Sequence, residues 1–234
     1  MAPTYFVGHP GSTPPTAIVA PHFFPFAVNR RMTAPMSSSE SLPDPVAAAK
    51  AELRRTMIAK REALPVADRV AAAEAIAARG LPVNVPSGAI VSGYSPLKSE
   101  VSPVPLMRRL AQAGAKLALP VVIKRGSPLT MRAWAFGEAL GSGQWGIREP
   151  KPEALEVFPD FLIVPLAAFD REGYRLGYGA GYYDMTIARL HGMKSIVTMG
   201  IAFAAQEVKA VPKTPRDEKL DFILTEREVI DLRA

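Results

Sequence analysis

A glycine-rich segment in the second half of the chain carries the clearest chemical signal in this sequence. In full it is Arg175, Leu176, Gly177, Tyr178, Gly179, Ala180, Gly181, Tyr182, Tyr183 and Asp184. An apolar run precedes it, and helically spaced apolar residues follow it, so the predicted order is strand, loop, helix. Glycines let a backbone approach a ligand closely, and the first amides of a helix have no internal partners. Such a loop favours an anion, most often a phosphate.

Charged residues at both ends of the segment fit this chemistry. Arg175 supplies a positive charge where the loop begins, and Asp184 places a carboxylate where a magnesium ion can link it to phosphate. The pattern alone leaves a second interpretation open, a tight connection followed by ordinary helix-end chemistry. Neither the dinucleotide fingerprint nor the Walker pattern fits, because the glycines alternate without a wider final gap and no Gly-Lys-Ser or Gly-Lys-Thr follows.

Other segments make this signal specific. Residues 165–170, Gly173 and 175–184 together resemble the signature of the 5-formyltetrahydrofolate cyclo-ligases, also named 5,10-methenyltetrahydrofolate synthetases. The remaining matching segments, in the family's order, are Lys50 with Leu53 and Arg54, Tyr94 with Glu100, 145–150, 200–206 and 217–221. The resemblance runs from Lys50 to Glu226, which is nearly all of the part expected to be globular.

The resemblance implies an ATP-dependent enzyme that converts 5-formyltetrahydrofolate into 5,10-methenyltetrahydrofolate and releases ADP and phosphate. It implies transfer of the γ-phosphoryl group to the formyl oxygen, then attack of the neighbouring nitrogen on the activated carbon. No covalent enzyme intermediate is needed. ATP and Mg²⁺ are the implied cofactors, and the folate is the implied partner, with or without a polyglutamate tail. We expect a cytoplasmic monomer.

The resemblance also implies roles for single residues. The implied nucleotide-binding residues are Lys50, Arg54, Arg175, Leu176, Gly177, Tyr178, Gly179, Ala180, Gly181, Tyr182 and Tyr183. The implied folate-binding residues are Glu100, Trp145 and Tyr183, and the implied magnesium ligands are Asp184 and Asp221, with a weaker claim for Asp217. Two positions depart from the family: Ala180 stands where glycine or lysine is frequent, and Arg216 replaces a histidine.

From the residue patterns alone, an ordinary structural role remains open for each of these side chains. On a helix over 45–64, Lys50 lies about 40° and Arg54 about 80° from Val46, on the apolar side. A lysine there either snorkels at the edge of the stripe or meets a charged partner. Glu100 suits an ordinary solvated loop, and Trp145 lies in a glycine-rich loop, which makes a packed-core role less natural. Tyr183 has core spacing, and Asp221 suits the start of a strand.

Composition limits the chemistry. The 234 residues include no cysteine, which excludes disulfides, thiolate zinc sites and a cysteine nucleophile. There are three histidines, of which two precede residue 44, so catalysis by a histidine base is disfavoured. The net charge of +6 invites a nucleic-acid interpretation, but the basic residues are spread without a dense block, so we expect no nucleic-acid partner. No apolar stretch is long enough to cross a membrane.

Residues 1–44 differ from the rest, being rich in proline, serine and threonine with no acidic residue before Glu40. We expect a disordered or artefactual extension without a catalytic role. A transit peptide and a true start at Met32 or Met36 are the alternatives.

Residues 45–234 form the expected single domain. Helices are predicted over 45–64, 67–79 and 104–113 and after the glycine segment, and strands over 89–94, 116–121, 131–136, 161–166, 195–201 and 222–224. This alternation predicts an α/β three-layer sandwich with a largely parallel or mixed sheet flanked by helices. Ligands in such folds bind at the carboxyl ends of the strands.

Two other functions remain open at this point. A non-catalytic nucleotide- or folate-binding module would keep the loop without turnover. A sugar-phosphate isomerase would need a placed acid–base pair, which the sequence does not reveal.

Overall fold

Helices and strands alternate along the chain in the order that the apolar spacing predicts. The computed structural model describes residues 44–233. The helices are α1 (Pro45–Glu62), α2 (Val66–Arg79), α3 (Val104–Gln112) and α4 (Tyr182–His191), with short 3₁₀ turns η1 (Gln144–Gly146) and η2 (Ala204–Gln206). The strands are β1 (Ile90–Ser92), β2 (Lys116–Val121), β3 (Thr130–Ala133), β4 (Leu140–Ser142), β5 (Arg148–Pro150), β6 (Phe161–Pro165), β7 (Ala168–Phe169), β8 (Arg175–Leu176), β9 (Val197–Ile201), β10 (Phe222–Leu224) and β11 (Val229–Asp231).

Seven strands form one mixed sheet in the order β11-β10-β9-β6-β1-β2-β3. The five central strands are parallel, and each edge strand, β3 or β11, pairs antiparallel with its neighbour. The predicted largely parallel or mixed sheet is therefore confirmed.

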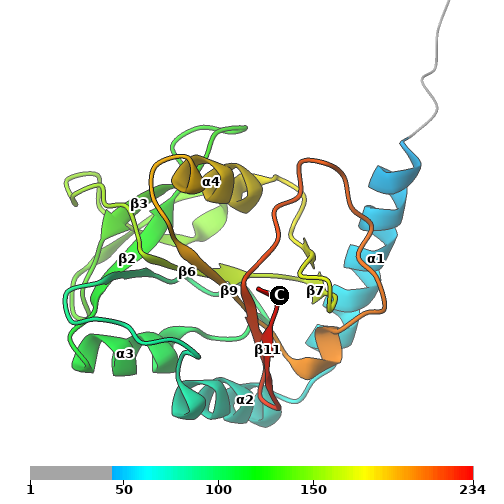
Figure 1. Ribbon diagram of the computed structural model, residues 1–234, viewed down its shortest axis with the longest axis horizontal. Helices are drawn as coiled ribbons and strands as arrows, with labels where there is room; N and C mark the ends of the chain where they lie inside the picture. Colours follow the sequence, from blue (N-terminus) through cyan, green and yellow to red (C-terminus); the bar gives the residue numbers. More distant parts are fainter. Residues whose placement is uncertain (1–43, 234) are drawn as a thin grey trace, which may run out of the picture. The chain divides into compact units, whose positions relative to one another are not determined.

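Alternating side chains of the buried strands point to two separate cores. Leu117 and Leu119 of β2 pack in the cluster that includes α2 and α3, whereas Ala118 between them packs in the cluster that includes α4. This alternation follows from the two-residue period of a strand, which buries both faces of a central parallel sheet. Figure 1 shows the result as three layers, with α4 over one face and α2 and α3 over the other. The predicted three-layer sandwich is confirmed.

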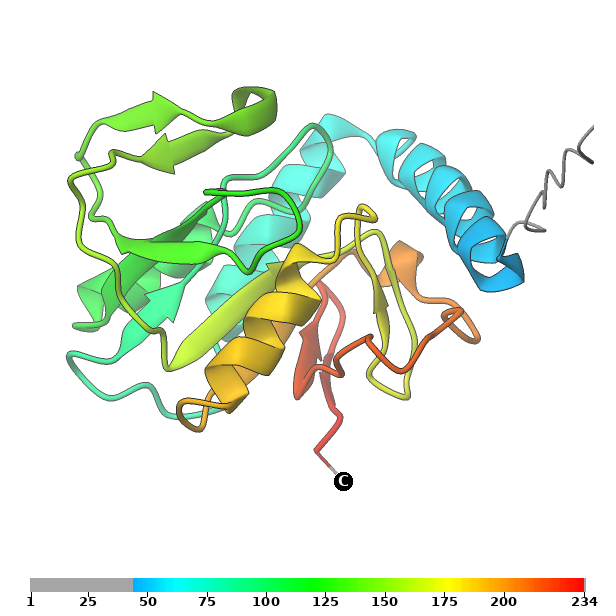
Figure 2. The same ribbon diagram turned by 90° about the horizontal axis from the view of Figure 1, so that it is seen from above.

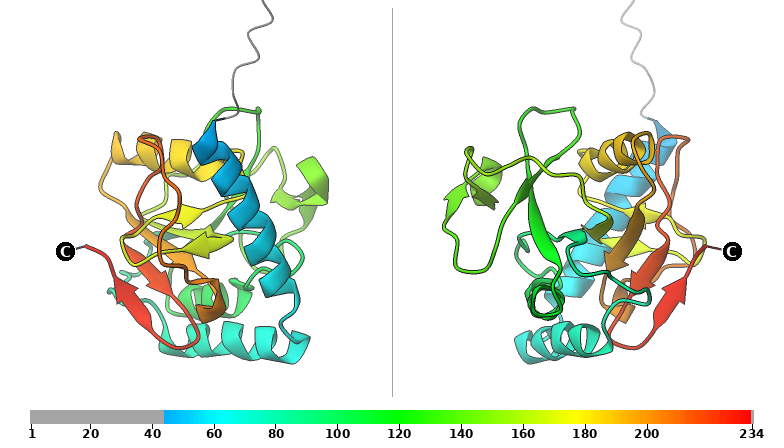
Figure 3. Two further views of the ribbon diagram at one scale, coloured as in Figure 1. Left: turned by 90° about the vertical axis from the view of Figure 1, so that its right-hand side faces the viewer. Right: turned by 60° about the vertical axis from the view of Figure 1, so that its left-hand side comes forward.

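Helix α1 lies outside these three layers. Its Met57 packs with Ala168, Leu176 and Val211 in a third apolar cluster, which joins the helix to the small hairpin of β7 and β8. The side chain of Asp44 accepts a hydrogen bond from the Val46 N–H and so caps the first turn. In Figure 3, α1 runs obliquely across the β7–β8 hairpin, which directly precedes the glycine loop.

A second hairpin, formed by β4 and β5, projects away from the main sheet (Figure 2). Its turn contains η1 and Trp145. The hairpin joins the rest of the fold mainly through β5, which contacts β2.

The sequence located most of the sheet but missed its shortest parts. The β4–β5 hairpin, the β7–β8 hairpin and β11 were not predicted, because their strands of two or three residues show neither a clear period nor an apolar run like that of β10. The prediction for residues 1–44 lies outside the described residues, apart from Asp44. Among the helices at 44–233, none has both the length and the apolar character required to cross a bilayer.

Candidate functional site

Two loops that carry predicted site residues follow neighbouring parallel strands. The loop with Glu100 follows β1, and the chain after β6 leads through the β7–β8 hairpin to the glycine loop. Because β1 and β6 are adjacent and parallel, both segments leave the sheet at its carboxyl edge.

Two residues of the glycine loop have a backbone conformation that favours glycine. Gly179 has φ of 100° and Gly181 has φ of 69°, both in the left-handed region. Gly181 is also the N-cap of α4, and no side chain caps this helix. The first amides of α4 are therefore not satisfied by a cap and can bind an anion.

Two basic residues of α1 contact the glycine loop and the segment that contains Asp217. The Nε of Arg54 donates to the Gly177 carbonyl oxygen at 2.7 Å, and a Cβ atom on Gly179 would come within 3.4 Å of the Arg54 guanidinium. One turn away, the Nζ of Lys50 forms an ion pair with Asp217 at 2.6 Å. Both side chains point toward the protein, as their predicted place on the apolar side of the helix requires. Burial lowers the pKa of Arg54.

Arg175 is buried and joins two segments of the site. Its Nη2 donates to Oδ1 of Asp184 at 3.0 Å, and its Nη1 donates to the Glu218 carbonyl oxygen at 2.7 Å. The same Asp184 oxygen accepts from the Glu218 N–H at 3.1 Å. The guanidinium thus holds the first turn of α4 against the segment that contains Asp217.

The predicted magnesium ligands Asp184 and Asp221 have different surroundings. The second oxygen of Asp184 accepts no hydrogen bond from the residues at 44–233, and this side chain is 26% exposed. Asp221 lies just before β10, at the amino end of the strand, where Oδ2 accepts from the N–H and the hydroxyl of Thr198.

Asp217 is the weaker of the predicted candidates for a magnesium ligand. It accepts hydrogen bonds from Lys50 and from the backbone and hydroxyl of Thr214. Burial alone would raise the pKa of Asp217, but these hydrogen bonds outweigh it and lower the pKa. The N–H of the next residue, Glu218, donates to Asp184 in the first turn of α4. The Asp217 carboxylate is therefore near the start of α4.

Glu100 is only 8% exposed, unlike the solvated loop residue that its pattern suggests. Its Oε2 accepts from the Leu97 N–H at 2.7 Å. Burial raises the pKa of Glu100, whereas the Tyr178 hydroxyl, the Leu97 N–H and the charge of Arg61 act in the opposite direction. Tyr94 and Tyr183 are close enough for the Glu100 charge to raise their pKa values further, after burial.

Trp145 lies at the tip of the β4–β5 hairpin and is 66% exposed. Its φ of 57° is in the left-handed region, which a bulky residue rarely adopts. The indole ring lies 6.2 Å, between centroids, from the ring of Tyr182 at the start of α4. The hairpin thus brings an exposed aromatic face next to the glycine loop.

Sequence reasoning missed the importance of Arg61 and Ser99, which connect these parts. Arg61 donates to the Ser99 hydroxyl and to the Tyr178 hydroxyl. The available signal was the helical position of Arg61, on the same side of α1 as Lys50 and Arg54.

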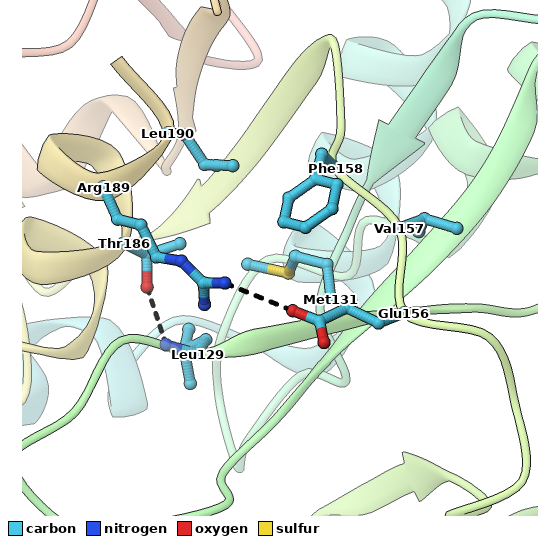
Figure 4. Close-up of a pocket in the computed structure, with 8 residues that line it drawn as sticks. All are labelled: Leu129, Met131, Glu156, Val157, Phe158, Thr186, Arg189 and Leu190. Atoms are coloured by element: carbon cyan, nitrogen blue, oxygen red, sulfur yellow. Dashed lines mark hydrogen bonds and ion pairs between the residues drawn. The ribbon is translucent and has the colours of Figure 1, made fainter. Parts of the chain in front are cut away.

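A small pocket elsewhere has too little room to be this site. Figure 4 shows it between β3 and α4, where the Leu129 N–H donates to the Thr186 hydroxyl and Arg189 pairs with Glu156. Its volume is about 10 Å³, enough for a water molecule but not for a nucleotide or a pterin.

The assembled residues suit phosphate positioning and recognition of a polar ring. The loop leads into uncapped helix amides and is contacted by Arg54, and Lys50 lies one turn away on α1. Glu100 offers a carboxylate acceptor that is largely buried. Phosphoryl transfer needs little beyond such positioning and charge stabilisation.

Comparisons with known proteins agree with this chemistry. The model of the 5-formyltetrahydrofolate cyclo-ligase family matches residues 46–226. A 5-formyltetrahydrofolate cyclo-ligase of Mycolicibacterium smegmatis is 31% identical over 194 residues, covering 79% of this chain and 97% of the relative. That of Escherichia coli K12 is 32% identical over 145 residues, covering 59% and 79%.

The fold agrees as well. The solved 5,10-methenyltetrahydrofolate synthetase of Aquifex aeolicus superposes with a TM-score of 0.66 at 33% identity, covering 79% of this chain and 93% of that one. With the match to the family model over residues 46–226, these likenesses establish that the chain belongs to the 5-formyltetrahydrofolate cyclo-ligase family.

Proposed function

We propose that this protein is an ATP-dependent 5-formyltetrahydrofolate cyclo-ligase that forms 5,10-methenyltetrahydrofolate, ADP and phosphate. Family membership supports the reaction class. The observation that carries the proposal is the uncapped start of α4 behind a left-handed glycine loop, with Arg54 and Lys50 beside it and buried Glu100 connected to it.

The reaction proceeds in two steps. The formyl oxygen forms a bond to the γ-phosphorus while the bond between the γ-phosphorus and the β–γ bridging oxygen breaks, and ADP is released. The neighbouring folate nitrogen then attacks the activated carbon, forming a C–N bond and losing its proton, and phosphate leaves as the C–O bond breaks. Each step needs orientation and charge stabilisation more than a protein nucleophile, which fits a chain without cysteine.

The chain's own residues divide these tasks. The loop from Leu176 to Tyr183 donates backbone N–H groups to phosphate oxygens, and Arg54 fixes the loop through Gly177. Lys50 exchanges its partner Asp217 for a phosphate. Arg175 holds Asp184 in place through its ion pair.

Glu100 and Trp145 position the folate. The Glu100 carboxylate accepts hydrogen bonds from the pterin N–H groups, and burial strengthens such bonds. Trp145, from the projecting hairpin, and Tyr183, next to Glu100, offer faces for stacking. A folate with a polyglutamate tail fits the same proposal, since the pterin end is what these residues hold.

A magnesium ion fits the start of α4. Residues 44–233 contain no cluster of three or more His, Cys, Asp and Glu side chains arranged to hold a metal. Nucleotide-bound magnesium usually needs only one or two carboxylates besides the phosphates. The open oxygen of Asp184 supplies one, and the contacts favour Asp217 over the predicted Asp221 as the second. When bound, the ion would neutralise charge on the phosphate oxygens.

The two aspartates can be separated by substitution. We expect Asp217→Asn to raise the magnesium concentration that gives half-maximal turnover, by about tenfold if one charge-assisted contact is lost. Asp221→Asn should lower Tm, because Thr198 loses its charged acceptor, and should leave the magnesium dependence unchanged. The opposite result would restore Asp221 as the ligand.

The test of the function is absorbance at the methenyl-folate band with purified protein. We expect a rise with 5-formyltetrahydrofolate, ATP and Mg²⁺ together, and none when any one is omitted. Nucleotide binding without this rise would support a binding module instead. A sugar-phosphate isomerase gains no support from the described residues, since no placed acid–base pair accompanies the loop.

A further inference from the structure

Arg61 is a buried permanent charge that the proposed reaction does not yet use. It is 1% exposed and lies in the last turn of α1. Its Nε donates to the Ser99 hydroxyl at 3.0 Å, and its Nη1 donates to the Tyr178 hydroxyl at 2.7 Å, with a longer contact to the Leu166 carbonyl oxygen at 3.5 Å. A buried guanidinium costs several kcal/mol in desolvation unless such partners surround it.

Tyr178 makes Arg61 a link between the two binding loops. It lies within the glycine loop, and its side chain is 42% exposed, yet its hydroxyl reaches inward to Arg61. The guanidinium also lies 5.8 Å from the centre of the Tyr178 ring. The pKa of the same hydroxyl is raised by burial and then by the charge of Glu100, so the two groups lie near each other.

Ser99 closes the connection from the other side. It is buried, and it immediately precedes Glu100 in the folate loop. The fork of Arg61 therefore contacts the glycine loop through one nitrogen and the folate loop through another. The planar guanidinium fixes the relative position of the two hydroxyls, which a lysine ammonium would not do.

We propose that Arg61 is a positioning residue that couples nucleotide binding to folate binding through Tyr178 and Ser99. The proposal rests on the proposed function, since it concerns the same two ligands. A phosphate in the glycine loop orders the loop backbone and with it the Tyr178 hydroxyl. Ordered Tyr178 then holds Arg61, and through it Ser99 beside Glu100, so the second ligand no longer has to overcome that part of the ordering entropy.

The electrostatics of Glu100 agree with this arrangement. Burial raises its pKa, and Tyr178, the Leu97 N–H and Arg61 counteract the effect. The other titratable groups that face it are Tyr94 and Tyr183. Loss of the Tyr178 hydroxyl should therefore move the acidic limb of kcat/KM for the folate to higher pH.

The decisive experiment measures the Kd of 5-formyltetrahydrofolate with and without a non-hydrolysable ATP analogue and Mg²⁺. For the wild-type protein we expect the analogue to tighten folate binding at least about fivefold, within the usual range of coupling between sites. Tyr178→Phe should bring this ratio close to one. Arg61→Lys should act in the same direction.

Tyr174→Phe is the matched control, because Tyr174 lies in the β7–β8 turn between two lysines and outside both loops. Its coupling ratio and pH profile should equal those of the wild type. If Arg61→Lys fails to fold, Tyr178→Phe still decides, since that side chain is partly exposed.

Independent binding of the two ligands by the wild type would overturn the proposal, as would unchanged coupling in Tyr178→Phe. Neither result would bear on the reaction itself. The reaction is tested separately by the turnover of the wild type, measured as absorbance at the methenyl-folate band.

Discussion

Arg175 shows how burial changes the role of a charged residue. The sequence suggested a direct phosphate contact, because the residue begins the glycine segment. In the structure its guanidinium has only a few per cent of its surface exposed and is bound to Asp184 and to the Glu218 carbonyl oxygen. Its direct effect is therefore to hold the start of α4 in place, and its effect on phosphate passes through Asp184 and the loop.

Replacing this residue tests that role. We expect Arg175→Ala to lower kcat/KM about ten- to hundredfold, the cost of a lost charge-assisted hydrogen bond of about 1.5–3 kcal/mol. It should also lower Tm, since Asp184 loses its partner. The exposed pair of Arg189 with Glu156 supplies the control: Arg189→Ala should change kcat/KM little. Near-normal turnover of Arg175→Ala would remove Arg175 from the site.

Glu100 makes stability and activity depend on pH in opposite ways. Its pKa is raised in the folded protein, chiefly by burial. The folded state therefore binds this proton more tightly than the unfolded chain does. The free energy of unfolding then falls as pH rises from the ordinary carboxyl range through the raised pKa. Folate binding through the proposed Glu100 contact, however, would need the charged form.

Glu100→Gln should separate the two effects. With rising pH between about 4 and 7, the Tm of the variant should improve relative to the wild type, because no buried charge forms. At neutral pH its kcat/KM for the folate should fall at least about tenfold. Exposed Glu74→Gln serves as the control for both measurements. A Tm difference that stays constant with pH would contradict the assigned cause.

Helix α1 and the glycine loop act together at the scale of elements. The helix places Lys50, Arg54 and Arg61 at successive levels of one side, and each contacts a different part of the site. The loop depends in turn on glycine at Gly179, where φ is 100° and Arg54 lies close. The position of the helix and the path of the loop are thus mutually dependent.

Two alanine substitutions in the same loop test this dependence. Gly179→Ala puts a residue with a side chain into a backbone conformation that favours glycine, at a cost of about 1–2 kcal/mol, and brings a Cβ atom close to Arg54. ATP affinity should therefore fall about tenfold or more. Gly177→Ala should have a smaller effect, because its φ is not positive and a Cβ atom there meets nothing within 4 Å. Equal losses in ATP affinity would show that backbone strain is not the cause.

At the scale of the whole molecule, the described residues form a three-layer fold. Both faces of the sheet are covered, and the family match begins at residue 46. Asp44, the first residue that the structure describes, caps α1.

Truncation tests whether the preceding residues matter for catalysis. A chain that begins at Leu42 keeps the Asp44 cap, and we expect its Tm and kcat/KM to equal those of the full chain. Removing Asp44 as well should lower Tm, since an N-cap contributes about 1 kcal/mol. A marked loss of turnover in the first truncation would assign residues 1–41 a role in the reaction.

The sequence by itself determined the fold class, the long elements and the family. The periods of β2, β6 and β9 and of α1 to α4 are local properties of the chain, so they are visible before folding. The glycines at 177, 179 and 181 predicted the loop, and at 179 and 181 the left-handed backbone disfavours other residues.

Only the tertiary structure decided how charges are paired and which of them are buried. It joined Lys50 to Asp217, turned Arg175 inward, placed Asp221 at the amino end of β10 and brought Arg61 between Tyr178 and Ser99. Most of these partners are far apart in sequence, and Ser99, Tyr178 and Asp217 lie in segments without a period. The energy of a charge depends on its burial and neighbours, and those are properties of the packed molecule alone.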